Sequence, residues 1–296
     1  MAIETLPEPS LPITTPLRPR FGFLTSTPII ATATVCLGLI IALAILAPLI
    51  APHDPLLLAP AQRLKPANAQ FLLGTDAFGR DVLSRLLYGG RVSLVIGIGA
   101  AICSIVAGLA IGLVSGFFKW VDAVMMRIMD GLMAIPSILL AIAVISLSGA
   151  TVSTVLVAIT IPEIPRVARL VRSVVLSARE EPYVEAAISV GSSLPKIMWR
   201  HLMPNTIAPL IVQGTYVCAS AILTEAILSF LGAGISPETP TWGNMMADGR
   251  AFFLIKPSLI FWPGLLLSIA ILSINLIGDA ARDALDPRMK QREGGK

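Results

Sequence analysis

The stretch that decides the fold is EAAISVGSSLPKIMWRHLMPN, residues 185–205. It is polar and rich in breakers, and apolar segments long enough to cross a bilayer lie on both sides of it. The residues predict a short helix over 182–190 that ends at Gly191, because glycine adopts positive φ at little cost, and a second short helix that ends at Pro204. We therefore expect a helix–glycine–helix elbow over residues 181–204, exposed to water between two membrane spans.

The composition indicates an integral membrane protein. Hydrophobic residues make up 55% of the 296 residues and charged residues 14%, with a mean hydropathy of +0.82, whereas a soluble domain carries roughly 25% charged residues. We expect an all-α, polytopic fold, with a flexible cytoplasmic tail at 1–28, a transmembrane domain at 29–289 and a short cytoplasmic tail at 290–296. The apolar runs predict six transmembrane helices, at residues 29–51, 92–118, 131–147, 151–171, 206–230 and 259–277.

The distribution of basic residues predicts the orientation. With the N-terminus in the cytoplasm, fifteen of the 22 Lys and Arg residues lie inside and seven outside. The positive-inside rule favours this arrangement, which places both termini and the elbow in the cytoplasm.

Three carboxylate or amide side chains within the predicted spans are candidates for a functional role, and a fourth lies near the outer interface. Glu163 is in the fourth span, where an unpaired carboxylate costs several kcal/mol, and Arg166 is its expected partner. Gln213 lies about 10 Å into the fifth span, and Asn275 is near the cytoplasmic end of the sixth. Because lipid offers no hydrogen-bond partner, Gln213 should face protein or a water-filled passage, and Asn275 could bond across helices. Glu163, Gln213 and Asn275 are therefore candidates for lining a passage. Glu225 falls near the outer interface, where we expect a solvated or paired surface carboxylate.

Further charged residues lie at the cytoplasmic ends of the spans. Residues 119–130 are expected to form a short link, in which Arg127 and Asp130 have the spacing of a helical ion pair. Arg166, Arg169 and Arg172 share one helix face and are expected to reach lipid phosphates. The alternative for Asp122, Arg127 and Asp130 is that they brace the elbow against the bundle, and the alternative for the three arginines is a role in gating.

Several classes of chemistry lack their usual signals in the sequence. No Gly-x-x-x-x-Gly-Lys-Ser/Thr motif occurs, so a phosphate-binding loop of that kind is absent from this chain. His53 and His201 are the only histidines, and the three cysteines lack metal-site spacing. No acid, base and nucleophile gather in one place, so we expect a non-catalytic chain without cofactor or metal.

The residues Glu185-Ala186-Ala187, Gly191 and the ending at Pro204 resemble the EAA loop of ABC importer permeases. His201 and Met203 stand where that loop usually has Ile and Leu. Three further stretches are similar to the second permease subunit of the dipeptide, oligopeptide and nickel importers, and the resemblance covers roughly residues 70–289. These stretches are residues 73–85, residues 229–234 with 241–244, and residues 278–288.

The resemblance implies a type I ABC importer permease in the bacterial inner membrane. It makes the elbow a coupling helix that docks on an ATP-binding subunit through Glu185, Ala186, Ala187, Gly191 and Pro204. The implied partners are a homologous permease in a heterodimer, two ATP-binding subunits that carry ATP and Mg, an extracytoplasmic solute-binding protein and the lipid bilayer, with no nucleic acid. The implied cargo is a di- or oligopeptide or a similar small solute, with glutathione, nickel chelates and opines left open.

Two other classes of function remain as alternatives. An ion-gradient-driven secondary transporter or channel would show inverted repeats or charges at the membrane midplane, and Glu163 is the single candidate for such a charge. An intramembrane enzyme would need a His/Asp/Ser or metal set within the spans. Co-purification of ATPase subunits with the chain separates the importer from both.

Overall fold

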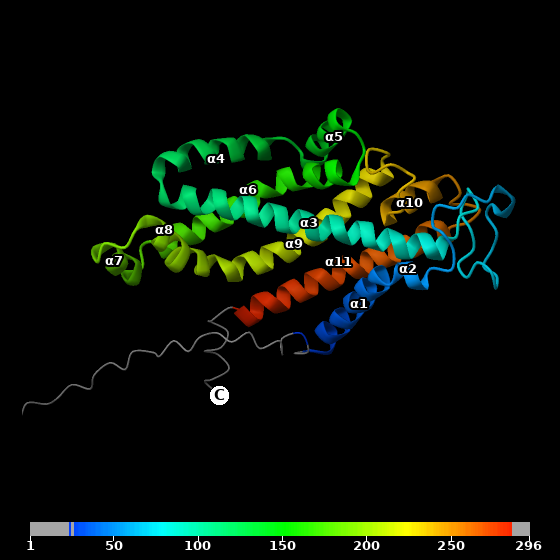
Figure 1. Ribbon diagram of the computed structural model, residues 1–296, viewed down its shortest axis with the longest axis horizontal. Helices are drawn as coiled ribbons and strands as arrows, with labels where there is room; N and C mark the ends of the chain where they lie inside the picture. Colours follow the sequence, from blue (N-terminus) through cyan, green and yellow to red (C-terminus); the bar gives the residue numbers. More distant parts are fainter. Residues whose placement is uncertain (1–23, 25–26, 286–296) are drawn as a thin grey trace, which may run out of the picture.

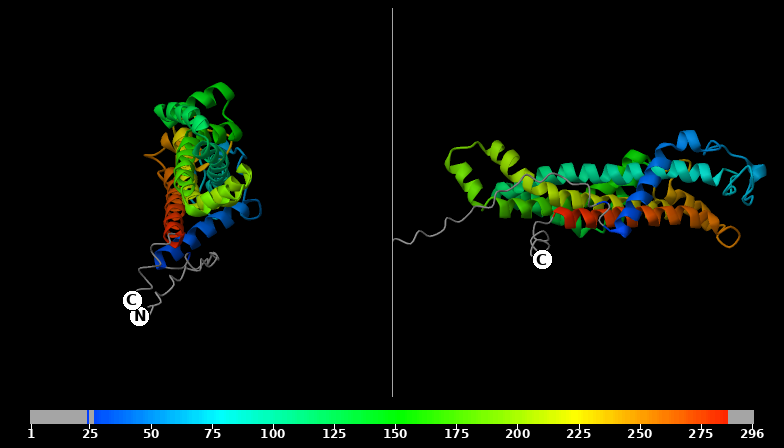
Figure 2. Two further views of the ribbon diagram at one scale, coloured as in Figure 1. Left: turned by 90° about the vertical axis from the view of Figure 1, so that its left-hand side faces the viewer. Right: turned by 90° about the horizontal axis from the view of Figure 1, so that it is seen from below.

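The computed structural model describes residue 24 and residues 27–285, so most of the predicted N-terminal tail and all of the predicted C-terminal tail lie outside the described residues. The molecule is an elongated bundle whose long helices run along one axis (Figure 1). Helix α7 lies at one end, and α10 lies at the other with the loop before α3; we call these the α7 end and the α10 end. Viewed from below, the same two groups again lie at opposite ends (Figure 2). The helices are α1 (Pro28–Ile45), α2 (Ala47–Ile50), α3 (Val82–Phe117), α4 (Lys119–Ala134), α5 (Ser137–Ser148), α6 (Val152–Ala178), α7 (Pro182–Ser189), α8 (Leu194–Ile197), α9 (Met203–Phe230), α10 (Trp242–Arg250) and α11 (Ser258–Leu285).

The described part of the chain is mostly helical, as predicted, and its only β-pairing is an isolated bridge between Thr75 and Asp81. Four helical rods are long and apolar enough to cross a bilayer: α1, α3, the rod Leu194–Phe230 and α11. The pair α4 and α5 passes the same test only as a bent pair. Helix α6 carries Glu163 and three arginines and packs against both α3 and α9.

Several helices begin or end at residues other than the bounds of the predicted spans. The first span is interrupted at Leu46, between α1 and α2. The second begins at Val82, ten residues earlier than predicted, where the Asp81 carboxylate caps the helix by accepting a hydrogen bond from the Ser84 amide at 3.0 Å. Residues 119–130 are part of α4 rather than a link. The fifth predicted span, 206–230, is the far part of a longer helical rod.

The predicted third span, 131–147, is not one helix. The chain bends by 90° between α4 and α5. Ile135 has φ −90° and ψ 128°, an extended conformation, and it precedes Pro136. A proline disfavours helical geometry in the residue before it, so Pro136 explains the break.

Helices α3 and α6 pack closely through a row of glycines on α3. Gly108, Gly112 and Gly116 recur every four residues and face Val167, Val171 and Val175 of α6, respectively. A Cβ added to Gly112 would lie 2.6 Å from the Ala168 carbonyl oxygen, so there is no room for a side chain. Small residues at this spacing let two membrane helices approach closely, which maximises van der Waals contact.

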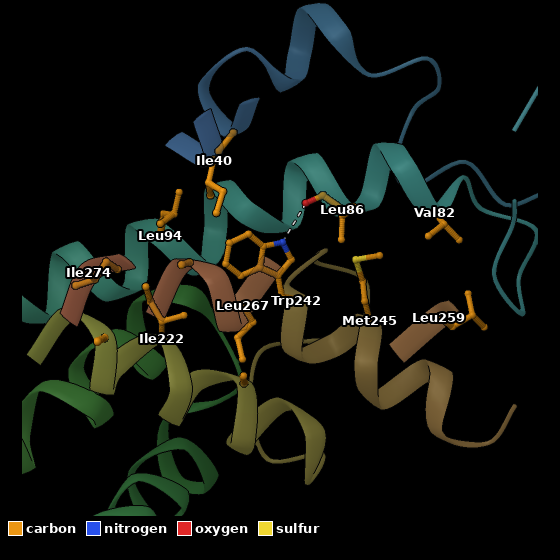
Figure 3. Close-up of a cluster of buried hydrophobic side chains, with 14 residues drawn as sticks. Ile40, Val82, Leu86, Leu94, Ile222, Trp242, Met245, Leu259, Leu267 and Ile274 are labelled. Carbon is orange, nitrogen blue, oxygen red and sulfur yellow. Dashed lines mark hydrogen bonds between the residues drawn. The ribbon is translucent and has the colours of Figure 1, made fainter. Parts of the chain in front are cut away.

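At the α10 end, Trp242 holds α10 against the long helices. Its side chain is 1% exposed, and its indole N–H donates to the Leu86 carbonyl oxygen at 3.1 Å (Figure 3). Ile40 of α1, Leu94 of α3 and Ile222 of α9 belong to the same buried cluster. This cluster therefore joins α10 to three long helices.

A buried ionic network ties the loop before α3 to α10. Arg80 contacts Asp76 at 2.6 Å and Asp248 at 2.7 Å, and Arg85, which is 1% exposed, lies 3.5 Å from Asp248. Burial raises the pKa of the Asp248 carboxyl, and the two arginines oppose that shift. Lys256 also donates to the Thr75 carbonyl oxygen at 2.8 Å. The loop and α10 thus form one cap.

Candidate functional site: the elbow and the contact between α6 and α9

The elbow has the bend that its sequence predicts. Helix α7 begins at Pro182, and its end is closed by hydrogen bonds from Gly191 N–H to the Ile188 carbonyl at 2.9 Å and from Ser192 N–H to the Ala187 carbonyl at 3.0 Å. Gly191 has φ +82°, in the left-handed region that favours glycine. The bend therefore depends on this residue type.

The second arm of the elbow differs from the prediction. Pro204 does not end a helix; it lies in the first turn of α9, and the rod continues from Leu194 to Phe230. Between α8 and α9, residues 198–202 form a π-helical turn, in which the Met203 N–H bonds to the Met198 carbonyl five residues back. This wider turn relieves the clash that a proline ring otherwise makes with the preceding turn, so the helix passes through Pro204.

Two surfaces of the elbow are open. Glu185 and Ala186 are exposed and Ala187 is half-buried. A depression of about 360 Å³ lies between the two arms, lined on the α7 side by Ala186 and Ala187 and on the other side by Lys196 and Arg200. Small residues on one side and basic residues on the other suit a partner segment that approaches closely and carries negative charge.

The elbow is fixed to the bundle by buried apolar contacts and one polar contact. Val184, Ile197 and Leu202 are each at most 1% exposed and pack in one cluster with the ends of α3 and α6. The Asn205 side-chain amide donates to the Tyr183 hydroxyl at 2.9 Å, joining α7 to α9. The elbow therefore moves with the start of α9.

The arginines of α6 bind carboxylates of α4, which corrects two predictions. Asp130 pairs with Arg169 at 2.5 Å rather than with Arg127, and Asp122 pairs with Arg172 through both carboxylate oxygens. Two of the three arginines are thus engaged with protein and not with lipid phosphates. The partners are 39 and 50 residues apart, so helical spacing within one segment did not indicate them.

The predicted pair of Glu163 and Arg166 is confirmed. The Arg166 guanidinium lies 3.3 Å from the Glu163 carboxylate, and the Ser220 hydroxyl of α9 lies 3.4 Å from the same carboxylate. Glu163 is buried, whereas the Arg166 side chain is 42% exposed. Helix α6 continues through Pro162 and Pro165, so both residues lie on a continuous helix.

The other two candidates for lining a passage lie apart from this pair. Gln213 is half-buried on α9, two turns before Ser220, and Asn275 is half-buried on α11. Helix α11 packs mainly on α9 and α1. Among the described residues, the hydrogen-bond partners of Glu163 are Arg166 and Ser220, so the three candidates do not form one cluster.

Glu225 is not at the surface, contrary to the prediction. Its side chain is fully buried and accepts hydrogen bonds from the Ser229 hydroxyl at 2.8 Å and the Ser93 hydroxyl at 3.3 Å. The i, i+4 spacing of Glu225 and Ser229 on one helix could have indicated the first of these partners. No sequence signal indicated Ser93, which lies on α3.

Comparisons with known proteins identify the family. The family described as binding-protein-dependent transport system inner membrane component matches residues 104–291. A probable peptide ABC transporter permease protein of Sinorhizobium fredii is 51% identical over 84% of this chain and 86% of its own length. A dipeptide transport system permease protein of Alkalihalophilus pseudofirmus is 39% identical over 96% of this chain and 94% of its own length.

A solved structure has the same fold. The structure described as the MetNI methionine ABC transporter in an inward-facing conformation aligns with a TM-score of 0.53 and 20% sequence identity, over 68% of this chain and 97% of that chain. The helical bundle and the sequence relatives agree: this chain belongs to the family of binding-protein-dependent transport system inner membrane components, the permeases of ABC transporters.

Proposed function

We propose that this chain is the permease subunit through which an ABC importer passes di- or oligopeptides or similar small solutes, driven by ATP hydrolysis on partner subunits. The peptide and dipeptide permeases among its relatives support this cargo class. The observation that carries the coupling part of the proposal is the elbow: an exposed bend at Gly191, fixed to the start of a rod that continues as α9.

In this proposal an ATP-binding subunit holds α7 in a groove. Ala186 and Ala187 allow close approach, Glu185 pairs with a basic residue of the partner, and Gly191 sets the direction of α8. Pro204 marks the place where the rod enters the membrane. The rod Leu194–Phe230 has 37 residues, about 55 Å at 1.5 Å per residue, so a push on the elbow reaches the opposite side of the bilayer.

The partners and the orientation follow from the same scheme. A homologous permease completes a heterodimer, two ATP-binding subunits carry ATP and Mg at the α7 end, and a solute-binding protein meets the cap at the α10 end. The first described turn of α1 and the last turn of α11 both point towards the α7 end (Figure 1), which supports cytoplasmic termini in a bacterial inner membrane. The chain itself carries no cofactor in this scheme.

The passage in this proposal runs beside α6 and α9, with Glu163 and Gln213 among its lining residues and Asn275 near its cytoplasmic exit. ATP binding draws the two elbows of the heterodimer together and opens the passage outward; hydrolysis resets it. Burial of Glu163 against Ser220, between two helices that both end at the elbow, supports this placement.

The test is purification of the tagged chain from its native host in mild detergent, followed by reconstitution into proteoliposomes. We expect ATPase subunits to co-purify with the chain. Peptide uptake should require ATP on the side of the membrane that carries these subunits. Glu185→Lys releases the ATPase subunits while the chain still inserts in the membrane. Uptake that follows a proton or sodium gradient without ATP would instead establish the secondary transporter.

A further inference from the structure

A row of polar side chains runs along α6, and a second row runs along α9, which packs against it. On α6 the row has spacing i, i+7 and i+11, which places its members on one helix face, and on α9 it has spacing i, i+3 and i+7. The contact between Glu163 and Ser220 joins the two helices at the inner ends of the rows. We call the two rows the polar seam; its members are Arg166, Ser173 and Ser177 on α6 and Gln213, Tyr216 and Ser220 on α9.

Arg166 lies near the middle of its helix. It is fourteen residues after Val152 and twelve before Ala178, about 21 Å and 18 Å along the axis. In the proposed membrane arrangement this position of α6 lies within the bilayer, where a guanidinium that is 42% exposed does not face lipid, because hydrocarbon offers no partner for its N–H groups. The face of α6 that carries Arg166 therefore meets protein or water.

The end of the polar seam favours water. Ser173 and Ser177 line a depression of about 460 Å³ that also touches Tyr183 and Asn205, beside the elbow. The hydroxyls of these serines already donate to carbonyls of their own helix, at 2.7 Å and 3.2 Å, so they need no partner protein. A polar face that opens at the α7 end into a depression is the arrangement of a water-filled route.

The guanidinium has unused hydrogen-bonding capacity. Its Nη1 atom is directed to Glu163, at 3.3 Å and 3.4 Å to the two carboxylate oxygens, and no contact of its Nε or Nη2 atom is found within the described residues. These two atoms form the edge that binds a carboxylate through two parallel hydrogen bonds. Glu163 holds the guanidinium in place and offsets its charge while the route is empty.

We propose that Arg166 binds the free carboxylate of the cargo as it crosses the membrane, and that Glu163 is the positioning residue that keeps this binding weak. An isolated guanidinium in a route of low dielectric would hold an anion too tightly, whereas transport requires a site that the cargo leaves again. The site thus accepts peptides and other small solutes with a free carboxylate. This inference rests on the proposed passage.

The test uses the complete importer in nanodiscs without nucleotide, in a background whose three cysteines are replaced by alanine. A Ser220→Cys variant is labelled with a charged methanethiosulfonate reagent, and the labelling rate is measured with alanyl-alanine, N-acetyl-alanyl-alanine or alanyl-alanine amide. We expect the two peptides with a free carboxylate to slow labelling at least fivefold and the amide to leave the rate unchanged. A Ser173→Cys variant, at the open depression, reports the accessibility of the route itself.

Substitutions then assign the effect to the ion pair. Arg166→Gln abolishes protection, whereas Arg169→Gln, which removes the next arginine of α6, leaves it intact. Glu163→Gln lowers the peptide concentration for half-protection about tenfold and slows uptake, a combination that a purely structural role does not give. Equal protection by the amide, protection that survives Arg166→Gln, or a Ser220→Cys variant that never reacts with the reagent would each overturn the inference. ATPase co-purification and ATP-dependent uptake are measured on the same preparations, so a failure of the proposed function is seen separately.

Discussion

Substitution of Gly191 tests the elbow most directly, because the structure separates backbone strain from packing. Gly191 has φ +82°, and an added Cβ meets nothing within 4 Å. A side chain therefore costs only the left-handed conformation, about 1–2 kcal/mol for most residues and less for asparagine. Since 1.4 kcal/mol is a factor of ten, Gly191→Ala is expected to lower the population of the native bend roughly five- to thirtyfold relative to other conformations of the elbow.

The assay compares Gly191→Asn, Gly191→Ala and Gly191→Val in the reconstituted importer. We expect membrane insertion to be unchanged and both ATPase retention and uptake to fall in that order, with the β-branched valine lowest. Gly38→Ala on α1 is the matched control, because an added Cβ there also meets nothing within 4 Å and its φ is not positive. Wild-type uptake in the alanine and valine variants would refute the role assigned to the bend.

Substitutions at three further positions test helix packing and buried hydrogen bonds. Gly112→Leu forces α3 away from Val171 and should lower the thermal stability of the detergent-solubilised chain by about 1–3 kcal/mol, measured by thermal unfolding against Gly38→Ala. Trp242→Ala should cost about 3–5 kcal/mol in the same assay, whereas Trp242→Phe loses mainly one hydrogen bond, about 1 kcal/mol; equal losses would contradict the packing account. Glu225→Leu leaves buried hydroxyls without an acceptor and should be about 1–3 kcal/mol less stable than Glu225→Gln, and a more stable leucine variant would show that the carboxyl is dispensable.

The features that could be predicted from the sequence are those that depend on residues close together in the chain. The bend at Gly191 follows from one residue's access to positive φ, and the pair of Glu163 and Arg166 follows from spacing along a single helix. The break in the third span was also local, because Pro136 marks it, but the apolar run on both sides concealed it. The end predicted at Pro204 was wrong because a π-turn accommodates the ring.

The features that the sequence did not predict depend on residues far apart in the chain. Helix α3 starts before the predicted second span, and its first turns hold Arg85, which hydropathy places in a loop but which is buried beside Asp76 and Asp248. Arg172 pairs with Asp122 across 50 residues, and the Glu225 carboxyl is buried by contact with α3. No single segment contains the information for these contacts, so reading one segment at a time misplaces them.

The glycine row of α3 has a consequence for how this bundle changes shape. Helices α3 and α6 already approach as closely as their backbones allow. Separating them would lose van der Waals contact, and exposing apolar surface to lipid gives no compensating free energy. These two helices should therefore move as one rigid unit that keeps its geometry through the transport cycle. Helix α4 meets α6 through two ion pairs on partly exposed side chains and turns sharply at Pro136, so it is the element best suited to swing against that frame.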